Sequence, residues 1–158
     1  MHTSSHKPAM HYMHLGIMTV LMFVAMYAFM YAMVDRFENV FPNINQAYMA
    51  GLMTAPMLII ELLVMGMMYP NKILNYAIIG ASAVALTLCW FAIRSQIAVG
   101  NLQFIKSMIP HHSGAILMCG KADLTDTKLK ALCGRIIKGQ QEEIDEMKSI
   151  LANLQNKS

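Results

Sequence analysis

The sequence gathers side chains that bind soft metal ions in one short stretch. Met108, His111 and His112 lie close together, and Met118 and Cys119 follow them. On a helix, His112 lies one turn after Met108 and His111 lies two turns before Met118, which gives two adjacent stripes of soft ligands. Neutral imidazole and thioether groups together suit copper. This stretch therefore predicts a soft-metal site.

A second set of side chains lies on the stretch that should face this one. A helical hairpin that turns near residue 124 brings Met108 and His112 opposite residues 140–147. Two histidines with methionines and a facing polar set favour a binding site over plain core packing. The facing side chains are Gln140, Glu143 and Met147.

The three cysteines, Cys89, Cys119 and Cys133, form no CxxC pair and no four-ligand zinc pattern. The same hairpin places Cys119 near Cys133. Three roles fit this pair equally well: further Cu(I) ligands, a disulfide, or small core residues.

The N-terminal tail, residues 1–14, repeats the same ligand types. Tracts rich in histidine often bind metal, and a merely polar flank is the alternative. Because methionines accompany the histidines, we expect metal capture here. The candidate ligands are His2, His6, Met10, His11, Met13 and His14.

Three long apolar segments separate this tail from the hairpin. The chain has 158 residues, of which 56% are hydrophobic and only 13% charged, unlike ordinary soluble domains. Residues 15–34 carry no charge and at 1.5 Å per residue reach roughly the 30 Å of a bilayer core. Residues 47–69 and 73–93 have similar lengths. The sequence therefore predicts a multi-pass, three-span domain over residues 15–94.

Methionines recur about every four residues along the first two spans, so each set keeps to one side of its helix. Methionine also packs well in apolar surroundings, which is the alternative explanation. Glu61 favours a function, because an ionisable residue at mid-membrane is costly and usually faces a site or pathway. The ladders are Met18, Met22, Met26, Met30 and Met33, then Met49, Met53, Met57, Glu61, Met65 and Met68.

After Gly100 the pattern predicts two amphipathic helices, over residues 101–122 and 126–153, within a hairpin domain of residues 101–155. Two helices of this length cannot enclose a core between them. We therefore expect an all-α protein whose hairpin completes a four-helix bundle with another copy, as a homo-oligomer, or packs on the membrane part.

Two motifs of the hairpin resemble the domain-of-unknown-function 305 family: F-x-x-x-M-I-P-H-H-x-x-A-I-x-M, which begins at Phe104, and Q-x-x-E-I-x-x-M, which begins at Gln140. The resemblance covers residues 104–154. It implies a ferritin-like helical bundle, exported or attached to the bacterial inner membrane with the hairpin in the periplasm, and associated with copper binding and tolerance. The ligands it implies are Met108, His111, His112 and Met118, with Gln140, Glu143 and Met147 as further candidates.

The expected function is therefore sequestration of Cu(I) or Ag(I) by a membrane-anchored protein that contributes to copper homeostasis, with other copper-handling proteins as partners. One alternative is a Cu(I) conduit built from Met49, Met53, Met57, Glu61 and Met65. Another is a structural membrane adaptor without metal. No enzyme is expected, since the sequence has no Glu-x-x-His pair, catalytic triad or phosphate-binding loop. Nucleic acid is not an expected partner, because the net charge of +3 comes from scattered residues.

Overall fold

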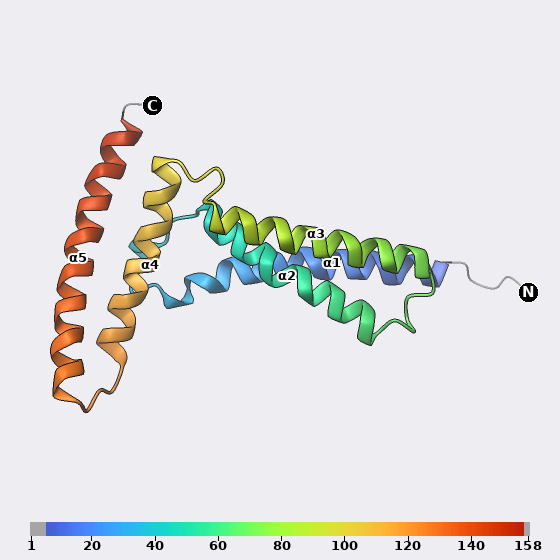
Figure 1. The fold of residues 1–158 in the computed structure, drawn as a ribbon, viewed down its shortest axis with the longest axis horizontal. Coiled ribbons are helices and arrows are strands. Elements are labelled where there is room, and N and C mark those ends of the chain that lie inside the picture. The colour runs from blue at the N-terminus through green and yellow to red at the C-terminus, as the bar shows by residue number, and fades with distance from the viewer. Residues whose placement is uncertain (1–5, 157–158) are drawn as a thin grey trace, which may run out of the picture. The chain divides into compact units, whose positions relative to one another are not determined.

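The computed structural model describes residues 6–156, and it describes side chains from Met10 onward. This part of the chain forms five α-helices, two short 3-10 helices and no strand (Figure 1), which confirms the all-α prediction. The chain divides into two compact units. The first, here called the span unit, draws on Met1–Phe29 and Ala47–Ile97, and the second, the hairpin unit, on Met30–Gln46 and Ala98–Ser158.

The span unit contains α1 (His6–Phe29), most of α2 (Ile44–Val64) and α3 (Lys72–Arg94), which run side by side in Figure 1. Each is long and apolar enough to cross a membrane, as predicted. Helix α1 begins earlier than the expected span, because the helix includes the described end of the His- and Met-rich tail. Leu15 and Leu62 are buried together where the helices meet.

Helix α2 ends at Val64, before the expected boundary at Tyr69. Gly66 weakens a helix, and Pro70 disfavours helical geometry at the residue before it. The chain turns back here, and Tyr69 becomes buried against Leu15 and Leu62. Glu61 therefore lies in the last turn of α2 rather than in the middle of a span, and it accepts a hydrogen bond from the Tyr69 hydroxyl at 3.2 Å.

The hairpin unit is built on α4 (Asn101–Lys121) and α5 (Thr127–Gln155). Asp126 caps α5, since its carboxylate accepts a hydrogen bond from the Leu129 backbone N–H at 2.8 Å. Gly100 is the N-cap residue of α4 and provides no side-chain cap. The hairpin core consists of Ile105, Ile109, Ile144 and Leu151.

The segment between α1 and α2, residues 30–46, packs against α4 and is here called the connector. It contains η1 (Met30–Met33) and η2 (Phe37–Asn39), and Phe41 packs on the hairpin core. Pro110 lies inside α4 and has no N–H, so the carbonyl of Lys106 loses its helical donor. The Asn43 side chain donates to that carbonyl at 3.3 Å. The connector thus covers one side of the hairpin, a contact that the sequence had not predicted.

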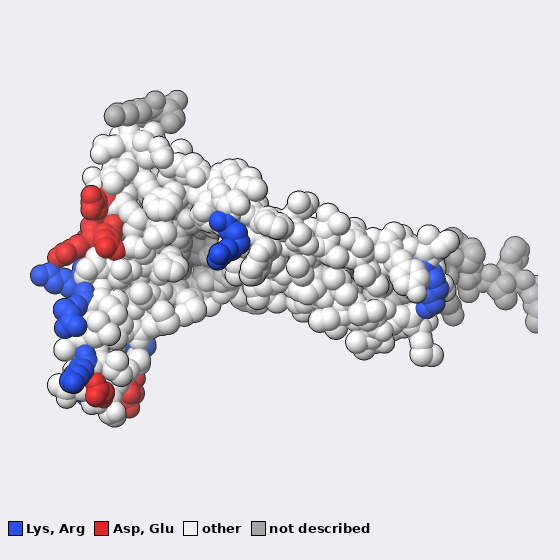
Figure 2. Space-filling model, viewed as in Figure 1, with Lys and Arg blue, Asp and Glu red and all other residues white. Residues whose placement is uncertain are grey.

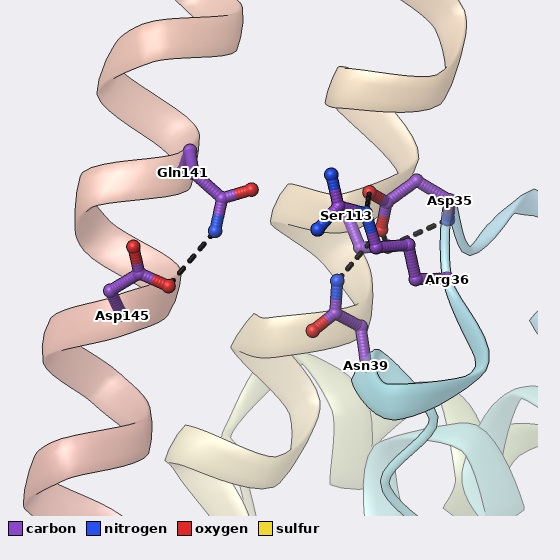
Figure 3. A network of polar contacts seen from close by, with 6 residues as sticks. All are labelled: Asp35, Arg36, Asn39, Ser113, Gln141 and Asp145. Atoms are coloured by element: carbon purple, nitrogen blue, oxygen red, sulfur yellow. Dashed lines mark hydrogen bonds and ion pairs between the residues drawn. The ribbon is translucent and has the colours of Figure 1, made fainter.

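A polar network fastens the connector to α4 (Figure 3). The buried Ser113 hydroxyl donates to the Asp35 carboxylate and accepts from the Asp35 backbone N–H at 2.8 Å. Asn39 also donates to this carboxylate, at 2.7 Å. Burial raises the pKa of Asp35, but these hydrogen bonds and the nearby Arg36 outweigh it and hold the pKa below the ordinary 3.8. The carboxylate is therefore ionised, and it holds α4 through Ser113 while Asn39 and Arg36 hold it within the connector.

Replacing Asp35 with asparagine should loosen the connector, at a cost of about 1–3 kcal/mol near neutral pH, because Ser113 loses a charged partner in a buried place. A carboxyl whose pKa is lowered by folding stabilises the protein above pH 3.8, and this contribution is lost as the pH falls through the lower, folded value. The protection factors of the α4 amides should therefore fall between pH 5 and 3 more in the wild type than in D35N. The exposed Glu38 provides a control: E38Q should behave as the wild type.

Candidate metal site

The two adjacent histidines of α4 occupy different environments. The His112 side chain is only 13% exposed and points to α5, whereas His111 is exposed. Their ring centroids are 5.9 Å apart. One helix turn therefore presents one sheltered imidazole and one accessible imidazole side by side.

His112 lies beside a carboxylate of α5. Its Nδ1 is 3.0 Å from Oε2 of Glu143, and the Gln140 amide donates to the same oxygen at 3.1 Å. Nδ1 is buried, and no described residue forms a well-aligned hydrogen bond with it. Burial lowers the pKa of His112; Glu143 opposes this effect, and His111 adds to the lowering. The ring is therefore neutral at neutral pH, and the contact with Glu143 joins a neutral imidazole to a carboxylate.

This arrangement fits a metal ligand. A histidine that binds a metal through one nitrogen usually holds its other nitrogen against a carboxylate, which fixes the ring orientation. Nδ1 of His112 has such a carboxylate in Glu143, which leaves Nε2 for the metal. Glu143 then acts as a positioning residue rather than as a ligand, and Gln140 holds Glu143. The sequence had treated both as candidate ligands.

The three candidate methionines lie in different places. Met108 is half-buried one turn before the histidines. Met147 packs against the core of the hairpin. Met118 is 54% exposed and lies seven residues beyond His111, roughly 10 Å along the helix. Within one chain, the structure thus groups Met108 with the two histidines and leaves Met118 apart. No cluster of three or more His, Cys, Asp or Glu side chains suited to a metal occurs among the described residues.

Cys119 and Cys133 form a disulfide, with Cα atoms 5.1 Å apart. This result selects one of the three roles that the sequence had left open. In this oxidised form, neither sulfur is a thiolate that could bind Cu(I). The bond ties α4 to α5 on the loop side of the histidine pair and so fixes the register in which His112 meets Glu143.

The other candidate ligands belong to the N-terminal tail. His2 lies outside the described residues, as does the side chain of His6. Three of the remaining side chains, Met10, Met13 and His14, are exposed on α1, while His11 is half-buried. The structure describes no metal-binding geometry among them.

The methionine ladder of α2 lies on the outer part of that helix. Met49, Met53 and Met57 of α2, and Met65 just after its end, are 36–41% exposed, while the buried positions of α2 are Ala50, Thr54, Ala55 and Leu62. A single chain therefore does not enclose this ladder. On α1, by contrast, Met18, Met22, Met26 and Met30 are partly buried and Met33 is exposed.

Sequence reasoning missed the residues that hold α4 from the connector side. Ser113, Ile109 and Pro110 are buried, because α4 packs against the connector as well as against α5. The Pro110 position was the available signal, because the carbonyl that it frees needs a donor from elsewhere.

Comparisons with known proteins concern the C-terminal part of the chain. Residues 101–158 match the family model described as Domain of unknown function (DUF305), which supports the family resemblance for the segment that contains α4 and α5. Uncharacterized protein L153 of Acanthamoeba polyphaga mimivirus is 45% identical to this chain over 71 residues. The aligned stretch covers 42% of this chain and 47% of that protein, so it spans about half the relative's length. No solved structure matches the chain.

Proposed function

We propose that this protein is a membrane-anchored Cu(I)- and Ag(I)-binding protein whose hairpin sequesters the ion. The observation that carries the proposal is the environment of His112. Its ring is sheltered and neutral, and its buried Nδ1 lies 3.0 Å from a carboxylate. His111 and Met108 lie within one turn of it on the same helix. A neutral imidazole with a thioether nearby is the donor set that soft copper favours over hard cations.

Each side chain has a distinct role in this proposal. His112 and His111 supply nitrogen, and Met108 supplies sulfur. Glu143 orients His112, and Gln140 orients Glu143 through the 3.1 Å hydrogen bond. Binding needs no chemical step, so we propose storage or tolerance rather than catalysis.

Three apolar helices long enough to cross a bilayer support the membrane anchor. The disulfide supports a location for the hairpin on an oxidising side of the membrane, because glutathione and thioredoxin keep thiols reduced in the cytosol. For a bacterial inner membrane, this side is the periplasm. Membrane lipid is then a constant partner, and copper-handling proteins would deliver or remove the ion.

A Cu(I) conduit receives less support. A conduit needs an enclosed row of ligands, and the α2 ladder is partly exposed on the single chain. Glu61 lies near the end of α2 and already accepts from Tyr69. We therefore assign the span unit to anchoring. A structural adaptor without metal would leave the pairing of His112 with Glu143 unexplained.

A growth assay tests sequestration in cells. Expression of the full chain in a copper-sensitive bacterium should raise the tolerated concentrations of copper and silver, while zinc tolerance should not change. A matched strain that expresses the H111A/H112A variant at the same membrane level should grow like the empty-vector strain. Equal protection by both proteins would contradict the assignment of the site to the hairpin.

A further inference from the structure

One face of the hairpin is apolar and has no partner among the described residues. Helix α4 already uses two faces: Ile105, Ile109 and His112 meet α5, while Ser113 and Gly114 meet the connector. A third face remains, with residues spaced four and three apart as in a coiled coil. It carries Phe104, Met108, His111, Ala115 and Met118, of which Phe104 and Met118 are 51% and 54% exposed.

Helix α5 carries a matching stripe beside its buried face. It consists of Leu129, Leu132, Ile136, Gly139, Glu143 and Ile150, of which Leu129, Leu132 and Ile150 are 49%, 43% and 42% exposed. The helices are antiparallel, and the contact of His112 with Glu143 marks the edge of their shared seam. Helical geometry at 100° per residue puts both stripes on the same side of this seam. Together they form one surface, here called the open face, opposite the connector.

Charge along α5 is divided into two halves of opposite sign. The half nearer the loop carries Lys128, Lys130, Arg135 and Lys138, and the next stretch carries Glu142, Glu143, Asp145 and Glu146. Figure 2 shows blue side chains gathered on the loop half of the hairpin and a red group above them. A helix with this pattern complements a second copy of itself that runs in the opposite direction. Arg135 and Glu146 flank the open face. In such a pair, Arg135 of each copy would lie beside Glu146 of the other copy.

The position of the histidines agrees with the same symmetry. A two-fold axis that pairs Arg135 of one chain with Glu146 of the other crosses α5 midway between these positions, between residues 140 and 141. The contact of His112 with Glu143 and the Cys119–Cys133 disulfide place this level of α5 opposite residues 111–115 of α4, near His111. His111 is also the midpoint of the α4 stripe. An antiparallel pair would therefore bring His111 next to the partner's His111 at the axis.

We propose that two copies of this chain pair antiparallel through their open faces, and that the second copy completes the metal site. The open face would be buried as the core of a four-helix bundle. His111 would meet the partner's His111 at the axis, with His112 and Met108 of each chain beside this pair, so that one Cu(I) is shared by two chains. This inference rests on the proposed function for the identity of the ion, but the pairing stands on the apolar stripes and the charge pattern.

The test uses the full chain in detergent micelles. Light scattering after size-exclusion chromatography gives the protein mass, and competition with a chromophoric chelator gives Cu(I) affinity and stoichiometry. The wild type should be a dimer that binds one Cu(I) per two chains. F104E removes no ligand, yet it should be monomeric and bind Cu(I) at least about tenfold more weakly. Circular dichroism and the intact disulfide check that this variant still folds.

Exchange of charges tests the direction of pairing. R135E and E146R should each weaken the dimer about tenfold, because each change places like charges together at two symmetric positions, and R135E/E146R should restore it. K130E is the matched control, since Lys130 lies away from the open face and should leave the dimer intact.

Two results separate the two proposals. A monomeric wild type with one Cu(I) per chain would overturn the pairing and leave the proposed function standing. A dimer that F104E dissociates but that binds no Cu(I) would overturn the proposed function and the shared site.

Discussion

The H111A/H112A variant is expected to bind Cu(I) about 100-fold more weakly than the wild type, a loss of roughly 2.7 kcal/mol. The two changes remove both imidazoles of the α4 turn, and Met108 alone offers a single thioether. The fold should survive, because His111 is exposed and His112 lies at the edge of the hairpin core. Competition of the purified full chain with a chromophoric Cu(I) chelator measures the change.

Two further variants show where the site lies. H11A/H14A removes two imidazoles of α1 and should leave the affinity within about twofold of the wild type, since these residues lie in the other unit. E143Q should weaken binding roughly 10-fold to 100-fold, as the loss of an orienting carboxylate does in other metal sites. If H11A/H14A abolished binding and H111A/H112A did not, the site would belong to the N-terminal segment and the hairpin assignment would fall.

Loss of the Cys119–Cys133 disulfide is expected to destabilise the hairpin by about 3 kcal/mol, the entropy that closing a loop of about 15 residues removes from the unfolded chain. C119S/C133S should speed up amide exchange in α4 and α5, most strongly near their junction. It should also weaken Cu(I) binding, because the register that places His112 beside Glu143 becomes looser. Hydrogen exchange of the oxidised wild type and the variant measures the first effect.

Cys89 supplies the control for this prediction. It is the free cysteine of the described chain and lies in α3, where its sulfur approaches Gly51 of α2. A reductant should destabilise the wild type and C89S equally and should have no effect on C119S/C133S. A wild type that reductant leaves unchanged would show that the bond does not hold the hairpin.

Much of the fold followed from the sequence. The three long apolar runs could only be spans or buried helices, and each corresponds to a described helix, although α1 begins earlier and α2 ends earlier than predicted. The change of hydrophobic period after Gly100 placed α4 and α5 to within two residues of their ends. What the sequence did not reveal was the connector. Apart from the packing of Phe41, its contacts are single hydrogen bonds, such as Ser113 with Asp35 and Asn43 with the Lys106 carbonyl, and no periodic pattern encodes such contacts.

The candidate site was predictable in part. The spacing of Met108, His111 and His112 placed them on one turn whatever the packing, and the hairpin brought Glu143 opposite. Their separate roles depended on burial, which the sequence does not specify. His112 turns inward and meets Glu143, while His111 stays outside, because the connector and α5 occupy the other two faces of α4. Met118 lies too far along the helix for the same group within one chain.

The central claim is that this protein binds Cu(I) tightly and selectively. The most direct measurement is an anaerobic titration of the purified full chain against a chromophoric Cu(I) chelator, with Zn(II) as the comparison metal. We predict that the wild type withdraws Cu(I) from the chelator with a dissociation constant well below micromolar, while Zn(II) binds far more weakly. Failure to bind Cu(I) more tightly than micromolar would contradict the account.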